Sequence, residues 1–146
     1  MAALEAILGS TVVGKDGKDI DVKSLAGEGK VIGIYFSAHW CPPCRGFTPE
    51  LAKFYLKMKE LGKQLEIVFV SSDRDQASFD EYYGTMPWLA LKFSDREQKE
   101  ELGNKYGVRG IPTLVLIDGA TGETIKGNAR SNVVQDPNGD SFPWKE

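Results

Sequence analysis

Two cysteines, Cys41 and Cys44, are the residues of this chain whose type and spacing point most directly to chemistry. They lie in the segment Trp40-Cys41-Pro42-Pro43-Cys44, and this spacing on a helix lets both sulfurs meet across one turn. The first turn of a helix has unpaired N–H groups and the positive end of the helix dipole, which stabilise a thiolate at the cap position. We therefore predict that Cys41 is the nucleophile and that Cys44 is its disulfide partner.

Neighbouring residues adjust this chemistry. Arg45 places a cation in the same turn, and His39 adds a second one when it is protonated and turned towards the sulfur. Pro42 and Pro43 suit a first helical turn but lack the amide donors that would otherwise solvate the cap sulfur, which leaves the N–H of Cys44 close to it. The pattern predicts a thiolate that is less stabilised than beside a donor-rich dipeptide, and hence a reductant rather than a strong oxidant.

Two other readings of the cysteine pair are disfavoured. A zinc site needs about four N, S or O ligands, whereas the chain has no further cysteine and His39 is its only histidine. A purely structural disulfide across so short a loop would remove little entropy from the unfolded chain. We expect no metal and no organic cofactor, with the Cys41–Cys44 pair itself as the redox group.

The predicted elements place both sulfurs between a buried strand and a long helix. Residues 31–36 are apolar almost throughout, as is typical of a strand covered on both faces. Residues 65–70 form a second such run, and a strand, a long helix and a strand make the crossover unit of a parallel pair, so the fold class is α/β. The helix between them is predicted to end near Gly62 and to pack on the sheet through apolar residues at helical spacing, namely Phe47, Leu51, Phe54, Met58 and Leu61.

Shorter elements are predicted before and after this unit. Residues 11–13 and 20–22 flank an Asp-Gly turn and predict an opening β-hairpin. Residues 75–83 predict a short helix that turns Phe79 and either Tyr82 or Tyr83 towards the interior.

The last third of the chain predicts a helix and a hairpin. Ser94 with Glu97 makes a capping box at the start of a helix that stops near Gly107. Residues 114–117 predict a further strand, which a turn over 118–122 connects to a hairpin partner at 123–126.

Length and composition predict a single domain over residues 1–146, acting as a monomer, because this length can bury a core without staples and the proportions are those of a globular protein. The formal net charge of −3 offers no positive field for nucleic acid or for an anionic membrane surface. The start, Met1 to Leu8, lacks a basic leader and is interrupted by Glu5, and no run approaches the roughly twenty apolar residues that span a bilayer. The small number of cysteines predicts a reducing compartment, the cytoplasm, with the nucleus left open.

The run from Tyr35 to Pro49 closely resembles the active-site segment of tryparedoxins and nucleoredoxins, two thioredoxin-fold families. The similarity continues through residues 86–90 and 111–113, and through Asp136-Pro137 with residues 142–144 at the end. The resemblance implies a thioredoxin fold, which is a central mixed β-sheet flanked by helices, here with the hairpin at its N-terminal end.

The resemblance also implies roles for individual residues. Cys41 would attack the substrate disulfide, Cys44 would resolve the mixed disulfide, and Trp40 would flank the sulfurs at the surface. Pro112 would follow a cis peptide bond and face the thiols, while the backbone of Ile111 would pair with an extended substrate segment. An ordinary trans turn entering a strand is the alternative at Pro112.

Further matches and departures limit what can be transferred. Arg130 matches an arginine that lies beside the tryparedoxin active site and meets the anionic part of a thiol substrate, although a merely solvated arginine fits equally well. Tyr35 stands where classical thioredoxins carry a buried aspartate. Proton removal from Cys44 therefore needs water or another acidic side chain as the proton acceptor, for which Asp73 is our candidate. Ser72 replaces a tryptophan of tryparedoxins, which argues against trypanothione as the reductant.

Two functions of different classes follow. The first is an enzyme that reduces protein disulfides, those of peroxidases included, through a mixed disulfide, with an upstream dithiol or reductase as electron donor. The second is a redox-controlled binding module of the nucleoredoxin type, in which oxidation of the cysteines alters a docking surface near Trp40 and Pro112. A thiol peroxidase is disfavoured, because the cysteine pair sits in a thioredoxin-type motif.

Overall fold

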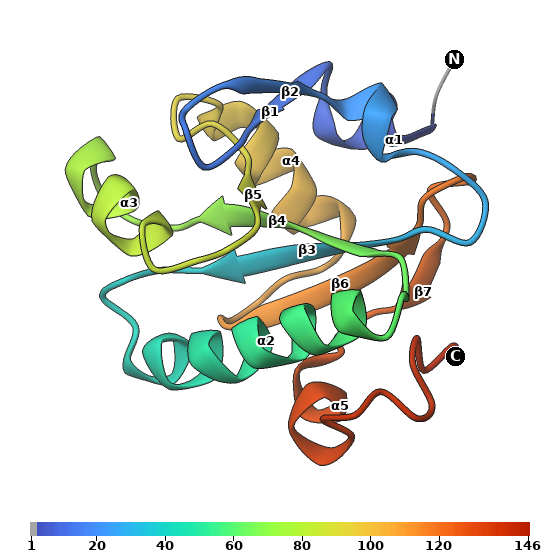
Figure 1. Cartoon of the computed structure of the whole chain (residues 1–146). Helices are drawn as coiled ribbons and strands as arrows, with labels where there is room; N and C mark the ends of the chain where they lie inside the picture. Colours follow the sequence, from blue (N-terminus) through green and yellow to red (C-terminus); the bar gives the residue numbers. More distant parts are fainter. Residues whose placement is uncertain (1–2) are drawn as a thin grey trace.

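The computed structural model describes residues 3–146. A mixed β-sheet with seven strands forms the centre of this part of the chain (Figure 1). Met1 and Ala2, which belong to the predicted start of the chain and to the predicted domain, lie outside the described residues. The spatial order of the strands is β2-β1-β5-β4-β3-β6-β7. Their bounds are Thr11–Val13 for β1, Asp19–Asp21 for β2, Val31–Ser37 for β3, Leu65–Ser71 for β4, Leu89–Ala90 for β5, Thr113–Asp118 for β6 and Thr124–Lys126 for β7.

Strand β3 occupies the inside of this sheet and leads directly to the cysteines. It pairs in parallel with β4 from Val31 opposite Leu65 to Ser37 opposite Ser71, and it pairs antiparallel with β6 on its other side. All seven of its residues are buried. The predicted central strand, the parallel crossover and the α/β class are thereby confirmed.

Helices cover both faces of the sheet, because residues on β3 point alternately to its two sides. Tyr35 belongs to the core cluster under α2, α3 and α5, whereas Ile34 and Phe36 belong to the opposite cluster under α1 and α4. Figure 1 shows α2 and α5 on one side and α1 and α4 on the other. The bounds are Ala3–Leu8 for α1, Pro42–Glu60 for α2, Gln76–Tyr83 for α3, Arg96–Lys105 for α4 and Arg130–Gln135 for α5, with a 3-10 helix, η1, at Val22–Leu25.

The packing of α2 follows its predicted apolar face with one exception. Phe47, Leu51, Phe54 and Met58 are buried, but Leu61 is 50% exposed. The helix ends at Glu60, so Leu61 is the cap residue and its direction no longer follows the helical period. The predicted short helix α3 buries Phe79 and both of its adjacent tyrosines.

Two predicted boundaries are wrong. Strand β2 ends at Asp21, because the Asp21 side chain accepts from the Lys23 N–H and caps η1, which begins at the buried Val22. The capping box of Ser94 and Glu97 does not form. Helix α4 starts one residue later, with Asp95 in the cap position and without a side-chain cap bond, because a turn bonds the Asp95 N–H to the carbonyl of Lys92.

Four elements were not predicted from the sequence, namely α1, η1, β5 and α5. Each has too few residues to show a helical or strand period. Strand β5 pairs only through two positions with β4 and one with β1, so it depends on strands that the chain brings to it from elsewhere.

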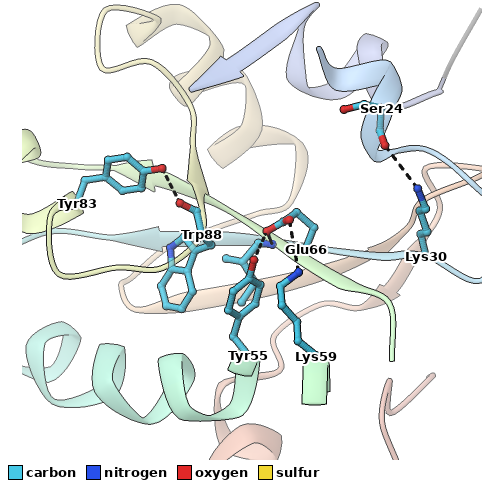
Figure 2. A network of polar contacts seen from close by, with 8 residues as sticks. Ser24, Lys30, Tyr55, Lys59, Glu66, Tyr83 and Trp88 are labelled. Atoms are coloured by element: carbon cyan, nitrogen blue, oxygen red, sulfur yellow. Dashed lines mark hydrogen bonds and ion pairs between the residues drawn. The ribbon is translucent and has the colours of Figure 1, made fainter. Parts of the chain in front are cut away.

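A polar cluster ties α2 to the sheet at a distance from the cysteines (Figure 2). The hydroxyl of Tyr55 on α2 donates to Glu66 Oε1 on β4 at 2.8 Å, and Lys59 Nζ lies 3.9 Å from Glu66 Oε2. Close by, the Tyr83 hydroxyl donates to the carbonyl oxygen of Trp88. Burial, reinforced by the carboxylate of Glu66, raises the pKa of Tyr55, so the phenol stays neutral and acts as a donor.

Substitution of Leu51 by alanine should destabilise the protein by about 2–5 kcal/mol, because Leu51 is fully buried between α2 and the sheet. The matched control is Leu56→Ala on the same helix, where the side chain is 55% exposed and the expected change lies within about 0.5 kcal/mol. Urea unfolding of both variants measures the difference in unfolding free energy. Equal losses would contradict the packing of α2 described above.

Candidate active site

Cys41 occupies the N-cap of α2, immediately after the loop that leaves β3. Its sulfur accepts a hydrogen bond from the Cys44 N–H at 3.3 Å. Pro42 and Pro43 fill the first two helical positions and have no N–H to donate. The structure thus shows the single amide donor that the sequence predicts at this sulfur.

The loop that leads into β6 lies against the same sulfur. Cys41 Sγ lies 3.8 Å from the carbonyl oxygen of Ile111, and the Ile111–Pro112 peptide bond is cis, as the resemblance implied. The Cys41 side chain is only 5% exposed and Cys44 is fully buried. Both cysteines are free thiols in the structure.

The two thiols sit in different environments. Burial is the main cause that raises the pKa of Cys44 from 9.0 to about 11, and the hydrogen bond with Cys41 adds to it. The hydroxyl of Ser37 and the backbone of Ala38 act in the opposite direction. Cys44 is therefore held as a neutral thiol at neutral pH.

Beneath Cys44 lies a chain of buried hydroxyl groups that the sequence did not predict. The Tyr82 hydroxyl lies 2.8 Å from Ser37 Oγ and 2.7 Å from Thr48 Oγ1, and the Tyr35 hydroxyl lies 2.6 Å from Thr48 Oγ1. Thr48 Oγ1 is 2.9 Å from the carbonyl oxygen of Cys44. The one local signal is that Tyr35 and Ser37 are two residues apart on β3 and share a face. Tyr35 thus belongs to a hydroxyl network at the position where a classical thioredoxin has a carboxylate.

Asp73 holds the loop before the cysteines in place. Its Oδ1 accepts from the His39 N–H at 2.7 Å and its Oδ2 accepts from Ser71 Oγ at 2.7 Å. Arg45 Nη1 donates to the carbonyl oxygen of His39 at 3.0 Å, so the first turn of α2 is fastened to the same loop. The observed contacts make Asp73 and Arg45 anchors of the backbone. The nearby side-chain hydroxyl that lowers the pKa of Cys44 is that of Ser37. The role of Asp73 as proton acceptor stays a prediction.

Aromatic side chains frame the exposed side of the site. Trp40 is 51% exposed, and its Nε1 donates to the carbonyl oxygen of Ser72 at 2.9 Å. The guanidinium of Arg74 lies 5.7 Å from the centre of the Trp40 ring, and the His39 ring stacks on Tyr82 at 5.1 Å. The resemblance implied that Trp40 lies at the surface, and its ring is half exposed there, whereas its role beside the sulfurs stays a prediction.

Arg130, the first residue of α5, lies on the other side of the site. It lines a surface pocket of about 410 Å³ together with Arg109, Ile111 and Pro112. The structure therefore brings all predicted site residues to one end of the sheet. Over residues 3–146, no cluster of three or more His, Cys, Asp or Glu side chains has the arrangement of a metal site, and none of the described helices has the length and apolar character to cross a membrane.

Comparison with known proteins places these features in a family. A family model described as thioredoxin-like matches residues 29–124. The tryparedoxin of Trypanosoma brucei brucei is 49% identical over 126 residues, which are 86% of this chain and 85% of the relative. The solved tryparedoxin structure from Trypanosoma brucei superposes with a TM-score of 0.93 at 44% identity, and the match covers 100% of both chains. The chain belongs to the tryparedoxin and nucleoredoxin family of thioredoxin-like proteins.

Membership of this family confirms the thioredoxin fold and makes the chain a thioredoxin-like dithiol oxidoreductase. The nucleoredoxin side of the family is represented by the probable nucleoredoxin 1 of Arabidopsis thaliana, which is 50% identical over 135 residues. This match covers 92% of the present chain but only 22% of that relative. The activities of whole nucleoredoxins therefore enter below only as proposals.

Replacement of Pro43 by alanine should make the dithiol more oxidising, because an N–H at the second helical position can reach the cap sulfur and stabilise the reduced, thiolate form. Pro42→Ala is the matched control, since a donor at the first helical position does not reach the cap side chain. Equilibration with glutathione redox buffers measures both reduction potentials. A Pro43→Ala potential equal to that of Pro42→Ala would refute this account of the proline pair.

Proposed function

We propose that this protein reduces disulfide bonds of other proteins by two successive thiol exchanges at Cys41 and Cys44. The observation that carries the proposal is the position of the Cys41 sulfur, which meets both the Cys44 amide at 3.3 Å and the cis-proline loop at Ile111. An attacking thiolate, its resolving partner and a backbone edge for the substrate are thus present within one turn of α2 and one loop.

In the first exchange, the Cys41 thiolate attacks one sulfur of the substrate disulfide. A bond forms between Cys41 Sγ and that sulfur, the substrate S–S bond breaks, and the second substrate sulfur leaves as a thiolate that takes up a proton. The Ile111 backbone next to the cis bond pairs with the extended substrate segment, which explains how one site serves many protein partners.

In the second exchange, Cys44 resolves the mixed disulfide. Its thiolate attacks Cys41 Sγ, the Cys41–Cys44 bond forms, and the substrate departs with both cysteines reduced. The substrate gains two electrons and the protein is left oxidised, so an upstream dithiol or reductase must return the protein to the dithiol form. The proton of Cys44 passes to water or to Asp73 before the attack, the leaving substrate thiolate takes up a proton from solvent, and the Ser37 hydroxyl stabilises the transient Cys44 anion.

The surrounding residues position these steps in our proposal. Trp40 and Pro112 flank the Cys41 sulfur, and Tyr35 belongs to the hydroxyl network beneath Cys44. The substrates are disulfide-containing proteins, with peroxidases among them, and the protein acts as a monomer in the cytoplasm. Family membership and the reactive centre described above support the disulfide-containing substrates, and the small number of cysteines favours the cytoplasm.

A redox-controlled binding module is the second candidate. Formation of the Cys41–Cys44 bond would remove the sulfur from its amide contact and alter the surface beside the half-exposed Trp40. Catalysis requires repeated cycles with a disulfide substrate and a reductant, whereas a binding module captures its partner stoichiometrically. Turnover counting therefore separates the two candidates.

The Cys44→Ser variant should accumulate a stable mixed disulfide through Cys41, because the first exchange remains possible and the resolving thiol is absent. Mass spectrometry of the variant after incubation with a disulfide protein identifies the adduct. Cys41→Ser is the control and should form no adduct, since Cys44 is fully buried. Adducts on Cys44 alone would overturn the assignment of the nucleophile.

The rate of the resolving step should rise with pH about tenfold per unit while Cys44 remains protonated. In the mixed disulfide Cys41 carries no charge, so its contribution disappears and burial alone raises the pKa of Cys44. The midpoint of the rise should then lie between 9.0 and about 11. Stopped-flow release of a fluorescent thiol from a preformed Cys41 mixed disulfide measures the profile, and a midpoint below 9.0 would contradict the described burial of Cys44.

A further inference from the structure

The hydroxyl groups beneath Cys44 form a continuous chain of contacts. The Tyr82 hydroxyl lies 2.8 Å from Ser37 Oγ and 2.7 Å from Thr48 Oγ1, and the Tyr35 hydroxyl ends the chain at 2.6 Å from Thr48 Oγ1. Burial raises the pKa of Cys44, and a hydrogen bond with the Ser37 hydroxyl acts against this rise. The resolving thiol is therefore bonded to one end of a chain of hydroxyls, of which the steps proposed above use only Ser37.

The number of hydrogens fixes the direction of these bonds while Cys44 is a thiol. A hydroxyl has one hydrogen to donate and two lone pairs that accept. Thr48 donates to the carbonyl oxygen of Cys44 at 2.9 Å, because a carbonyl can only accept. Tyr35 and Tyr82 must then both donate to Thr48. Tyr82 in turn accepts from Ser37, whose oxygen is left to accept from the Cys44 S–H.

Ionised Cys44 has no hydrogen to donate, but the chain can reverse without losing a contact between hydroxyls. Ser37 then donates to the thiolate, and Tyr82 donates to Ser37. Thr48 donates to Tyr82 and still accepts from Tyr35. The bond that Thr48 gives up is the one to the carbonyl oxygen of Cys44, an α-helical carbonyl whose regular partner is the N–H four residues later. The reversal needs only the rotation of hydroxyl groups and no net proton transfer along the chain.

The surroundings of the chain strengthen this effect. The side chains of Tyr35, Ser37, Thr48 and Tyr82 are at most 3% exposed. Burial raises the pKa of both tyrosines, so their phenols stay neutral and keep a hydrogen to donate. In such a water-free environment the hydrogen bonds of a chain polarise one another, and the bond to a charged group at its end is the strongest.

We propose that Tyr82 is a positioning residue for the resolving step and that the hydroxyl chain reverses its direction of donation when Cys44 ionises. Tyr82 then turns its hydrogen from Thr48 to Ser37, and Ser37 directs its own hydrogen to the sulfur. Tyr82 thus acts on the thiolate through Ser37. The proposal rests on the proposed function, because it concerns the second of the two exchanges.

The other titratable groups around the chain act in different ways. Cys41 is uncharged in the mixed disulfide. The His39 ring stacks on the face of the Tyr82 ring at 5.1 Å between centroids. The carboxylate of Asp73 accepts from the His39 N–H and from Ser71 Oγ. A test of Tyr82 must therefore separate its hydroxyl from the imidazole that lies on its ring.

The Tyr82→Phe variant removes the hydroxyl and keeps the ring. Stopped-flow release of a fluorescent thiol from the Cys41 mixed disulfide, prepared at acid pH, measures the resolving step. At pH 7.5 its rate should fall about threefold, and the pH profile should move up by about half a unit, because Ser37 loses the donor that polarises it. The first exchange, measured as attack of Cys41 on a disulfide peptide, should keep its wild-type rate.

Tyr83→Phe is the matched control. Tyr83 is the next residue on α3 and is also buried, but its hydroxyl donates to the carbonyl oxygen of Trp88. Urea unfolding should show similar losses of stability in both variants, whereas the Tyr83→Phe resolving rate should equal that of the wild type. The effect of Tyr82→Phe should persist in a His39→Gln background, and its disappearance there would assign the effect to the imidazole and overturn the proposal.

A double-mutant cycle tests whether Tyr82 acts through Ser37. Ser37→Ala removes the donor to the thiolate and should slow the resolving step about tenfold at pH 7.5. The Ser37→Ala/Tyr82→Phe variant should be no slower than Ser37→Ala, because Tyr82 then has no route to the sulfur. Losses that multiply in the double variant would contradict the reversing chain.

The outcomes separate this proposal from the proposed function. A wild-type pH profile of the resolving step in Tyr82→Phe would overturn the reversing chain and leave disulfide reduction intact. If the wild-type protein neither forms a mixed disulfide at Cys41 nor turns over a disulfide substrate with a reductant, the proposed function is refuted and this proposal with it.

Discussion

The hydrogen bond from the Cys44 amide to the Cys41 sulfur is the interaction on which the site depends. It exists because β3 delivers the chain to the N-cap of α2, where helical N–H groups have no partner within the helix. The prolines at the next two positions leave Cys44 as the donor, so the sulfur is held by one amide and by the loop at Ile111. The prolines thus restrict the backbone donors at this sulfur to one amide.

The same helical turn makes the two cysteines chemically different. Cys41 faces the cis-proline loop at the edge of the surface, while Cys44 turns inward against Ser37 and the hydroxyl network. Burial raises the pKa of Cys44 and keeps that thiol neutral until the nucleophile has reacted. This difference orders the two exchanges that we propose, because burial disfavours the Cys44 thiolate while the Cys41 sulfur lies at the edge of the surface.

The rigidity of this arrangement comes from contacts between distant segments. Asp73 fastens the His39 backbone to the end of β4, and Trp40 is bonded to Ser72 on the same segment. Tyr55 and Glu66 hold the far part of α2 to β4 (Figure 2). The helix that carries the cysteines is thus held to the sheet both near its start and near its end.

The sequence by itself determined the cysteine pair, the buried strand before it and the long helix after it, because these depend on residue type and on periods that repeat over neighbouring residues. It did not disclose that the Tyr82 hydroxyl contacts Ser37 and Thr48, which lie 45 and 34 residues away from it in the chain. It also misplaced the start of α4, where a local capping signal gave way to a backbone turn. Only the tertiary structure decided which distant hydroxyls, carboxylates and arginines surround the sulfurs, since contacts across the sheet leave no periodic trace in the chain.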